Sequence, residues 1–183
     1  MNKLALASQF ISPAPPPDDT YLRFQLSAEI GAAFSMEQVH EVVVISPEQM
    51  TPMFNMSACV LGLLTRRSRI MWIVDLAHLL LGEPLATTSP SSFQRYTVIV
   101  IRVNQASEPS NREFADTRPR LLGFVVREVK GSIQLSPDSI QAPKGHFSPA
   151  LTPCLQGSVL QDDTMLLVLD AEAITHSPLL QPR

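Results

Sequence analysis

Three arginines stand close together in the middle of the chain, in the stretch Arg66-Arg67-Ser68-Arg69. Apolar runs at residues 60–64 and 70–74 flank this stretch, which predicts two neighbouring strands joined by a polar bend. Guanidinium groups are planar, always charged and suited to bidentate pairing with a carboxylate. The bend is therefore either a solvated turn or a contact for an acidic group on another protein, and it is too short to bind RNA.

The other residue types that carry out catalysis or bind metals are scattered along the chain. The pair Asp162-Asp163 lies between apolar stretches and predicts a hairpin turn. His78 is expected on the surface of a short helix and His146 in a loop, and neither has a metal-ligand spacing. The sequence has no Gly-rich phosphate loop and no GxSxG nucleophile motif. We therefore expect no catalytic residue, no bound metal and no cofactor.

The composition favours a soluble globular protein that contacts other proteins. Of 183 residues, 45% are hydrophobic and 17% are charged, with a formal net charge of -3, which excludes the basic surface of a nucleic-acid binder. So few charges leave apolar area on the surface, where such patches mark contact sites. Cys59 and Cys154 are too few to build a disulfide scaffold. No stretch resembles a signal peptide or a membrane span, so we expect a cytoplasmic protein.

Short strands dominate the expected secondary structure. Apolar alternation and β-branched runs predict strands at residues 21–26, 32–36, 39–45, 60–64, 70–74, 96–103, 121–126, 129–135 and 165–169. A short helix is expected from Leu76, with Asp75 as its N-cap and Gly82 as its stop. A helical turn is expected at residues 170–174, and no convincing internal repeat is visible. This pattern predicts an all-β barrel or sandwich.

Pro- and Ser-rich stretches divide the chain. Residues 1–20 are a Pro-rich lead-in that we expect to be disordered, and residues 177–183 form a tail. Between them, a Pro- and Ser-rich linker predicts one subdomain over about 21–86 and a second over about 93–176. Residues 104–119 are expected to form a surface loop insertion. Each half is near the lower size limit for a core of its own, so we expect the two halves to pack against each other and to depend on that contact for stability.

Residues 60–76 resemble the central signature of the CheW family, the adaptor proteins that couple chemoreceptors to a histidine kinase. The positions that match this signature in register are Gly62, Arg67, Ile70, Val74, Asp75 and Leu76. Further stretches that resemble family elements, in the family's order, are residues 39–42, 122–129, 155–157 and 167–170. The resemblance runs from about Tyr21 to Ile174, which is nearly the whole chain.

The resemblance implies an all-β fold of two small five-stranded SH3-like β-barrel subdomains around a shared core, with one or two short helices. Exchange of terminal strands between the subdomains is one option. The implied function is a non-catalytic adaptor in chemotaxis, phototaxis or type IV pilus motility signalling. The implied partners are the regulatory domain of a CheA-type histidine kinase and the cytoplasmic tip of a methyl-accepting chemoreceptor or photoreceptor, with no nucleic acid and no direct membrane contact.

The receptor-facing residues carried over from the family are Val39, Glu41, Gly62 and Arg67. Val39 would offer an apolar contact, Glu41 and Arg67 charged or bidentate contacts, and Gly62 a close approach of the backbone. Two structural alternatives stay open. Glu41 and Arg67 could pair with each other, and Gly62 could serve only to relieve crowding between strands. Asp75 is assigned mainly to helix capping.

Four residues depart from the family pattern, namely Thr65, Ser68, Trp72 and Arg127. Ser68 replaces a usual glycine, which restricts positive φ and is expected to reshape the turn. A tryptophan at the position of Trp72, where the family usually has proline, is a feature of cyanobacterial relatives that serve phototaxis and pilus-driven motility, and in this respect the chain resembles them. Ser68 and Arg127 favour an alternative function, a divergent adaptor that binds a response regulator or a pilus component. A more remote alternative is a small-molecule-binding β-barrel.

Overall fold

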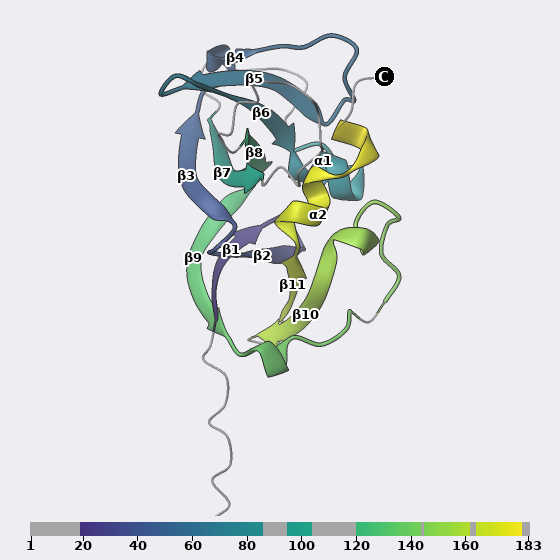
Figure 1. Ribbon diagram of the computed structural model, residues 1–183. Helices are drawn as coiled ribbons and strands as arrows, with labels where there is room; N and C mark the ends of the chain where they lie inside the picture. The colour runs from purple at the N-terminus through teal and green to yellow at the C-terminus, as the bar shows by residue number, and fades with distance from the viewer. Residues whose placement is uncertain (1–18, 86–94, 104–119, 144, 162–163, 181–183) are drawn as a thin grey trace, which may run out of the picture.

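The computed structural model describes residues 19–85, 95–103, 120–143, 145–161 and 164–180. Figure 1 shows two β-sheet subdomains, one above the other, with two short helices beside the junction between them. Residues 1–18 of the expected lead-in, the linker at 86–94, the expected loop at 104–119 and the expected turn at 162–163 lie outside the described residues. Residues 19 and 20, which were expected in the lead-in, belong instead to the first strand, because their backbone pairs with residues 134 and 135.

From here on, the two subdomains are named by the sheets of the structure and not by the predicted ranges. Subdomain one is a six-stranded sheet with the order β3-β7-β8-β6-β5-β4. Its strands are β3 (Val39–Ile45), β4 (Met50–Thr51), β5 (Val60–Arg66), β6 (Arg69–Asp75), β7 (Tyr96–Val103) and β8 (Arg120–Val126). Pairing is antiparallel except between β6 and β8. Although β3 and β5 are far apart in this order, Val43 and Leu64 share one buried cluster. The sheet therefore curls into a barrel-like form.

Subdomain two is a five-stranded sheet with the order β10-β11-β2-β1-β9. Its strands are β1 (Asp19–Gln25), β2 (Gly31–Ser35), β9 (Glu128–Leu135), β10 (Leu155–Gln161) and β11 (Thr164–Leu169). The pair β11–β2 is parallel and the others are antiparallel. Each sheet thus takes strands from both halves of the chain, and the sheets do not divide at the Pro- and Ser-rich linker between 86 and 93.

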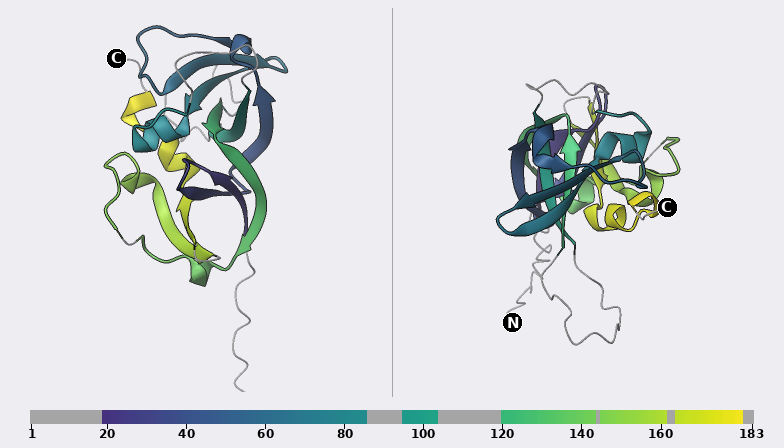
Figure 2. Two further views of the ribbon diagram at one scale, coloured as in Figure 1. Left: turned by 180° about the vertical axis from the view of Figure 1, so that it is seen from behind. Right: turned by 90° about the horizontal axis from the view of Figure 1, so that it is seen from above.

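The short helices follow the two β-hairpins and are capped alike. Helix α1 (Leu76–Leu81) begins at Asp75, whose carboxylate accepts a hydrogen bond from the backbone N–H of His78 at 3.0 Å, and it ends at Gly82 with φ 76°. Helix α2 (Ala171–Thr175) begins at Asp170 in the same way. Both helices lie beside the junction of the subdomains in the two opposite views (Figures 1 and 2). The expected caps of the first helix are confirmed.

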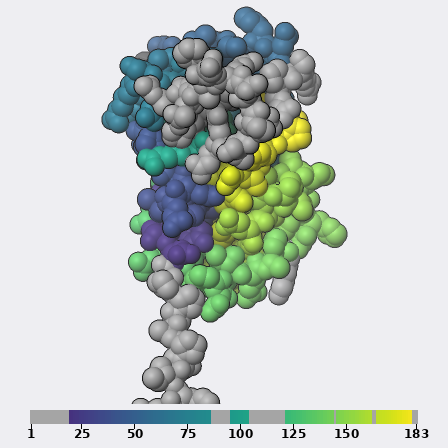
Figure 3. Space-filling model, viewed as in Figure 1, coloured from purple at the N-terminus to yellow at the C-terminus, as the bar shows by residue number. Residues whose placement is uncertain are grey.

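Short 3-10 turns complete the chain: η1 (Pro47–Gln49), η2 (Pro137–Ser139), η3 (Thr152–Cys154) and η4 (Pro178–Leu180). The last of these falls within the expected tail, and Leu180 packs against the core. In the space-filling view, the yellow C-terminal segment lies between the blue-teal surface of subdomain one and the green surface of subdomain two (Figure 3). The C-terminal segment therefore helps to join the two subdomains.

Three buried clusters form the core. One fills each barrel, and the largest lies between them. Strand β7 serves two clusters at once, because Val98 points into the first barrel while Ile99 points into the shared core. Phe34 of subdomain two stacks at 5.9 Å from Phe124 of subdomain one. Since both faces of the central strands are buried, their sequences are continuous apolar runs, and the predicted shared core is confirmed.

The subdomains contain two copies of one structural unit, a repeat that the sequence analysis did not recognise. In each copy a buried cysteine precedes a hairpin. The backbone oxygen of this cysteine accepts a 2.8 Å hydrogen bond from the backbone N–H of the aspartate that caps the following helix. The pairs are Cys59 with Asp75 and Cys154 with Asp170. A 3-10 turn that begins with Pro lies before each copy. These shared residues are few and separated, so local periodicity does not reveal them.

Candidate functional site

The arginine-rich bend is the turn of the β5–β6 hairpin. Arg66 and Arg69 are paired, which leaves Arg67 and Ser68 as a two-residue loop. Both have positive φ, 48° and 60°, as a type I′ hairpin turn requires. Ser68 thus adopts positive φ although it is not a glycine, because the twist of the strands favours the primed turn even where a non-glycine residue must adopt positive φ. The turn presents Arg67 to solvent.

Glu41 faces this hairpin because β3 contains a bulge. The register shifts between Val39 and Glu41, so Val39 lies opposite Ile101 and Glu41 lies opposite Val100. Val39 consequently packs toward the shared core, whereas Glu41 points to the side of the first barrel. Oε2 of Glu41 lies 3.5 Å from Nη2 of Arg66, with side-chain exposures of 23% and 35%. The structural pairing of Glu41 thus exists, but with Arg66 and not with Arg67.

A hollow of about 400 Å³ opens at this end of the first barrel. The residues that line it, called the cationic mouth below, are His40, Glu41, Arg66, Arg67, Arg69, Met71, Arg102 and Leu121. Four guanidinium groups therefore face one carboxylate. Arg102 donates from Nε and Nη2 to Nδ1 of His40, at 3.1 and 2.9 Å. Because arginine has no acceptor, Nδ1 of His40 is the acceptor in this contact.

A stripe of three valines lies on the face of β3 that is turned away from the interior of the first barrel. Val39, Val42 and Val44, called the β3 stripe below, lie on one face of the strand because the bulge restores their alignment. Val42 is 41% exposed and Val44 is 56% exposed, although Ile99, which lies opposite Val42, is part of the shared core. The sequence analysis named only Val39. The sequence does indicate Val42 and Val44: the run 42–45 is apolar at every position, whereas a strand with one buried face needs an apolar residue only at every second position.

Gly62 is explained by the fold. It lies at a bulge in β5, is buried, and has φ 148°. A Cβ atom there would lie 2.4 Å from the backbone oxygen of Thr51 on β4. Gly157 is its counterpart in the second copy, where a Cβ would lie 2.7 Å from the oxygen of Gln141. The structure brings Glu41 and Arg67 together in the cationic mouth, while Gly62 lies toward the other end of β5 and Val39 on the opposite face of β3.

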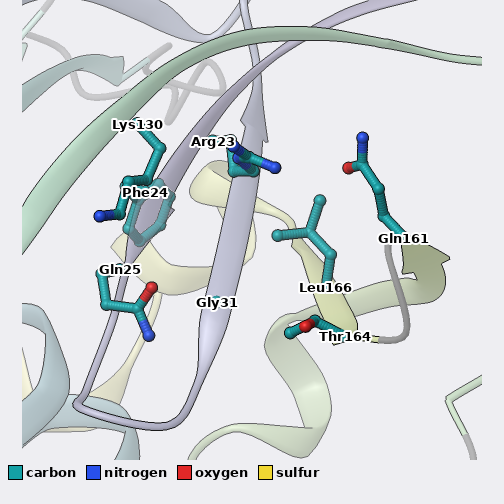
Figure 4. A pocket seen from close by; sticks show the side chains of 8 residues that line it. All are labelled: Arg23, Phe24, Gln25, Gly31, Lys130, Gln161, Thr164 and Leu166. Atoms are coloured by element: carbon teal, nitrogen blue, oxygen red, sulfur yellow. The ribbon is translucent and has the colours of Figure 1, made fainter.

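The second barrel has a corresponding but less cationic pocket, shown in Figure 4. Its volume is about 220 Å³, and it is lined by Arg23, Phe24, Gln25, Gly31, Lys130, Gln161, Thr164 and Leu166. In the repeat, Gln161 takes the place of Arg66 and Thr164 takes the place of Arg69. Arg23 and Gln161 point toward each other across this second mouth (Figure 4). The hairpin frame is therefore the same, and the chemistry of its rim differs.

Both thiols are buried and unoxidised. Sγ of Cys154 lies 3.5 Å from the backbone oxygen of Ala150. Burial raises the pKa of the Cys154 thiol, and the nearby charge of Asp170 raises it further. A buried thiol with a raised pKa is a poor nucleophile, so Cys154 serves packing.

The described part of the chain contains no group of three or more His, Cys, Asp or Glu residues that could hold a metal ion. In the same residues, no helix is long and apolar enough to cross a membrane. Among the groups described above, the features with the character of a binding surface are the cationic mouth and the β3 stripe. Both are suited to contacts with other proteins through charge and apolar area.

Comparisons with known proteins agree with this architecture. The sequence model of the CheW-like domain matches residues 20–178, which span both subdomains. The fold is similar to the crystal structure of the scaffolding protein TtCheW from Thermoanaerobacter tengcongensis, with a TM-score of 0.64 and 18% sequence identity over 88% of this chain and 94% of that chain. No curated protein matches the sequence. Because the family match covers most of the residues, this chain belongs to the CheW-like domain family.

Proposed function

We propose that the chain is a non-catalytic adaptor that couples a methyl-accepting receptor to the regulatory domain of a CheA-type histidine kinase. The observation that carries this proposal is the match to the CheW-like domain across both subdomains, because members of this family couple chemoreceptors to CheA kinases. Trp72 favours a phototaxis or pilus-motility pathway within that general role. Its place of action is the cytoplasm, where such a receptor presents its signalling tip.

Two surfaces support contact with the receptor. The β3 stripe offers the partly exposed apolar side chains of Val42 and Val44, in line with Val39 at the shared core, and a helical receptor tip can bury them. Arg67 and the Glu41–Arg66 pair lie at the open end of the first barrel, on the other side of β3 from the stripe, and can contact a second part of the receptor through charged hydrogen bonds. Gly62 contributes by permitting β4 to approach β5, since its own backbone is covered.

A binding experiment with the full chain tests this proposal. We would measure affinity for the receptor's cytoplasmic tip and for the kinase's regulatory domain, both taken from genes next to this one. Replacing Val42 and Val44 by Ser is expected to weaken receptor binding about tenfold, because two partly buried apolar contacts are lost. Arg67→Ala is expected to weaken it about threefold, as for a rim charge.

Leu160→Ser provides a matched control, because Leu160 is 74% exposed on the hairpin of the other subdomain. This control should leave receptor affinity unchanged. A folded protein that binds neither partner would overturn the proposal. Capture of a response regulator or a pilus component without the kinase would instead establish the divergent-adaptor alternative.

A further inference from the structure

We propose that the cationic mouth is a binding site for a carboxylate, supplied by an acidic segment of a protein partner. The inference rests on the proposed function in one respect, namely that the partner is a protein. It concerns the open end of the first barrel and not the β3 stripe, because the bulge in β3 turns these two surfaces to opposite sides of the strand.

The charge of the mouth opposes that of the chain. Four arginines and one glutamate line it, whereas the whole chain carries a formal net charge of -3. Arg66 is paired with Glu41, and Arg102 is held by His40. Arg67 and Arg69 are exposed, and within the described residues neither has an ion-pair partner. Among the described residues, the positive potential of the mouth is therefore only partly cancelled, and an incoming anion would relieve the remaining repulsion.

The shape of the mouth selects a carboxylate side chain. Its lining includes Met71 and Leu121, which are 1% and 6% exposed and belong to the barrel core. Apolar lining side chains below a ring of guanidinium groups fit the methylenes and the carboxylate of a glutamate. The planar forks of Arg67 and Arg69 can each donate two parallel hydrogen bonds to such a group. A volume of about 400 Å³ accommodates side chains and not a continuous polyanion track.

The second mouth shows that the fold does not need these arginines. The same hairpin frame in subdomain two carries Gln161 and Thr164 at the places of Arg66 and Arg69. Its cations are Arg23 and Lys130, and Lys130 is already paired with Glu128 at 2.6 Å. Stability therefore does not account for a ring of arginines around one mouth, and recognition of an anion does.

The test uses the full chain, isotope-labelled, with unlabelled hexaglutamate as the probe. Backbone and arginine side-chain NMR signals at residues 66–69 and 102 are expected to shift saturably. Arg69→Thr installs the residue type that the second mouth carries, and Arg67→Gln removes the charge of the turn. Each is expected to weaken hexaglutamate binding about fivefold, as for one partly exposed charge-assisted contact.

Two controls isolate the site and its chemistry. Arg23→Gln removes a cation from the second mouth and should leave the affinity within about twofold of the parent, as expected for a distant rim charge. Hexaglutamine should shift no signal, because it keeps the length of the probe and removes its carboxylates. Unchanged affinity in Arg69→Thr and Arg67→Gln, or shifts located elsewhere, would overturn the assignment. Orthophosphate that competes at a lower concentration than hexaglutamate would reassign the mouth to phosphate.

The outcome is separable from that of the adaptor proposal. A chain that binds the receptor tip and the kinase domain but gives no saturable shift with hexaglutamate retains its adaptor role and refutes the acidic-segment site. A chain that binds hexaglutamate at the mouth but neither partner protein refutes the adaptor role and supports the site.

Discussion

Removal of the Asp75 carboxylate should destabilise the protein more than removal of any comparable cap. Asp75 is fully buried. One of its oxygens accepts from the N–H of His78 at 3.0 Å and the other from the N–H of Leu85 at 2.7 Å. Asp75→Ala therefore removes the acceptor of the His78 N–H in the first turn of α1 and also the acceptor of the Leu85 N–H. Both losses fall where the helix packs against the shared core.

The expected magnitude follows from these two hydrogen bonds. Loss of an N-cap costs about 1 kcal/mol, and an unsatisfied buried donor costs about 1–3 kcal/mol more. The free energy of unfolding should thus fall by about 2–4 kcal/mol, out of a total of about 5–15 kcal/mol for an ordinary domain. For a chain of this size, the melting temperature should fall by about 6–12 °C.

Asp170 provides a matched control, because it caps α2 at the corresponding place in the second copy. Its carboxylate accepts from the N–H groups of Glu172 and Ala173, but it is only half-buried, so water can replace it. Asp170→Ala should cost about 1 kcal/mol. Urea unfolding followed by circular dichroism measures both variants. Equal losses in the two, or a loss below about 1 kcal/mol in Asp75→Ala, would refute the reasoning from burial.

Three further perturbations have defined outcomes. Gly62→Ala should lower the free energy of unfolding by about 3 kcal/mol, because its Cβ would overlap a backbone oxygen of β4. Gly131→Ala, also at positive φ but in open space, should cost about 1 kcal/mol in the same urea titration, and equal costs would contradict the clash. A double-mutant cycle on Glu41 and Arg66 should give a coupling of about 0.5 kcal/mol, because the pair is partly exposed and 3.5 Å apart; a coupling above about 2 kcal/mol would contradict this. Burial raises the pKa of Cys154 above its ordinary 9.0, so stability should be constant below that pH and fall as the pH rises through the raised pKa. Cys154→Ala should reduce this alkaline loss, measured by urea unfolding at several pH values, and an unchanged pH profile would exclude the thiol as its source.

Local patterns were sufficient to predict most elements. The β-branched run at residues 96–103 predicted β7 with its observed bounds. The order Asp, leucines at helical spacing, Gly predicted α1 and both of its ends. These predictions succeed because a helix cap or the buried face of a strand is determined by residues that lie close together in the sequence. The sequence analysis did not predict strand β10, in which Gly157 interrupts the regular pairing at a bulge.

The pairing of strands could not be read from local patterns. Strands β1 and β2 lie in the sheet with β9, β10 and β11, and strands β7 and β8 in the sheet with the strands before the linker. Each exchange joins segments that are far apart in the chain. Periodicity reports which face of a strand is buried and not which strand lies beside it. The two parallel pairs, which need long crossovers, add to this difficulty.

The candidate site was predicted in part for the same reason. The arginine-rich bend and Glu41 were identified from residue types and a family resemblance. Their pairing depends on a bulge that rotates part of β3, and a bulge leaves little trace in residue types. Val42 and Val44 are 41% and 56% exposed. Their apolar character alone indicates burial, so only the assembled structure separates the β3 stripe from the core.

The repeat within this chain separates residues that fold it from residues that bind. The two copies share what the frame requires, namely a buried glycine at the bulge, an aspartate cap and a buried cysteine. They differ on the rim of the mouth, where Arg69 in one copy stands against Thr164 in the other. Packing acts on both copies alike, so the frame does not require the residues that differ at these equivalent, solvent-facing positions. By this criterion Gly62 belongs to the fold, and the arginines of the first mouth are the residues for which we propose a role in recognition.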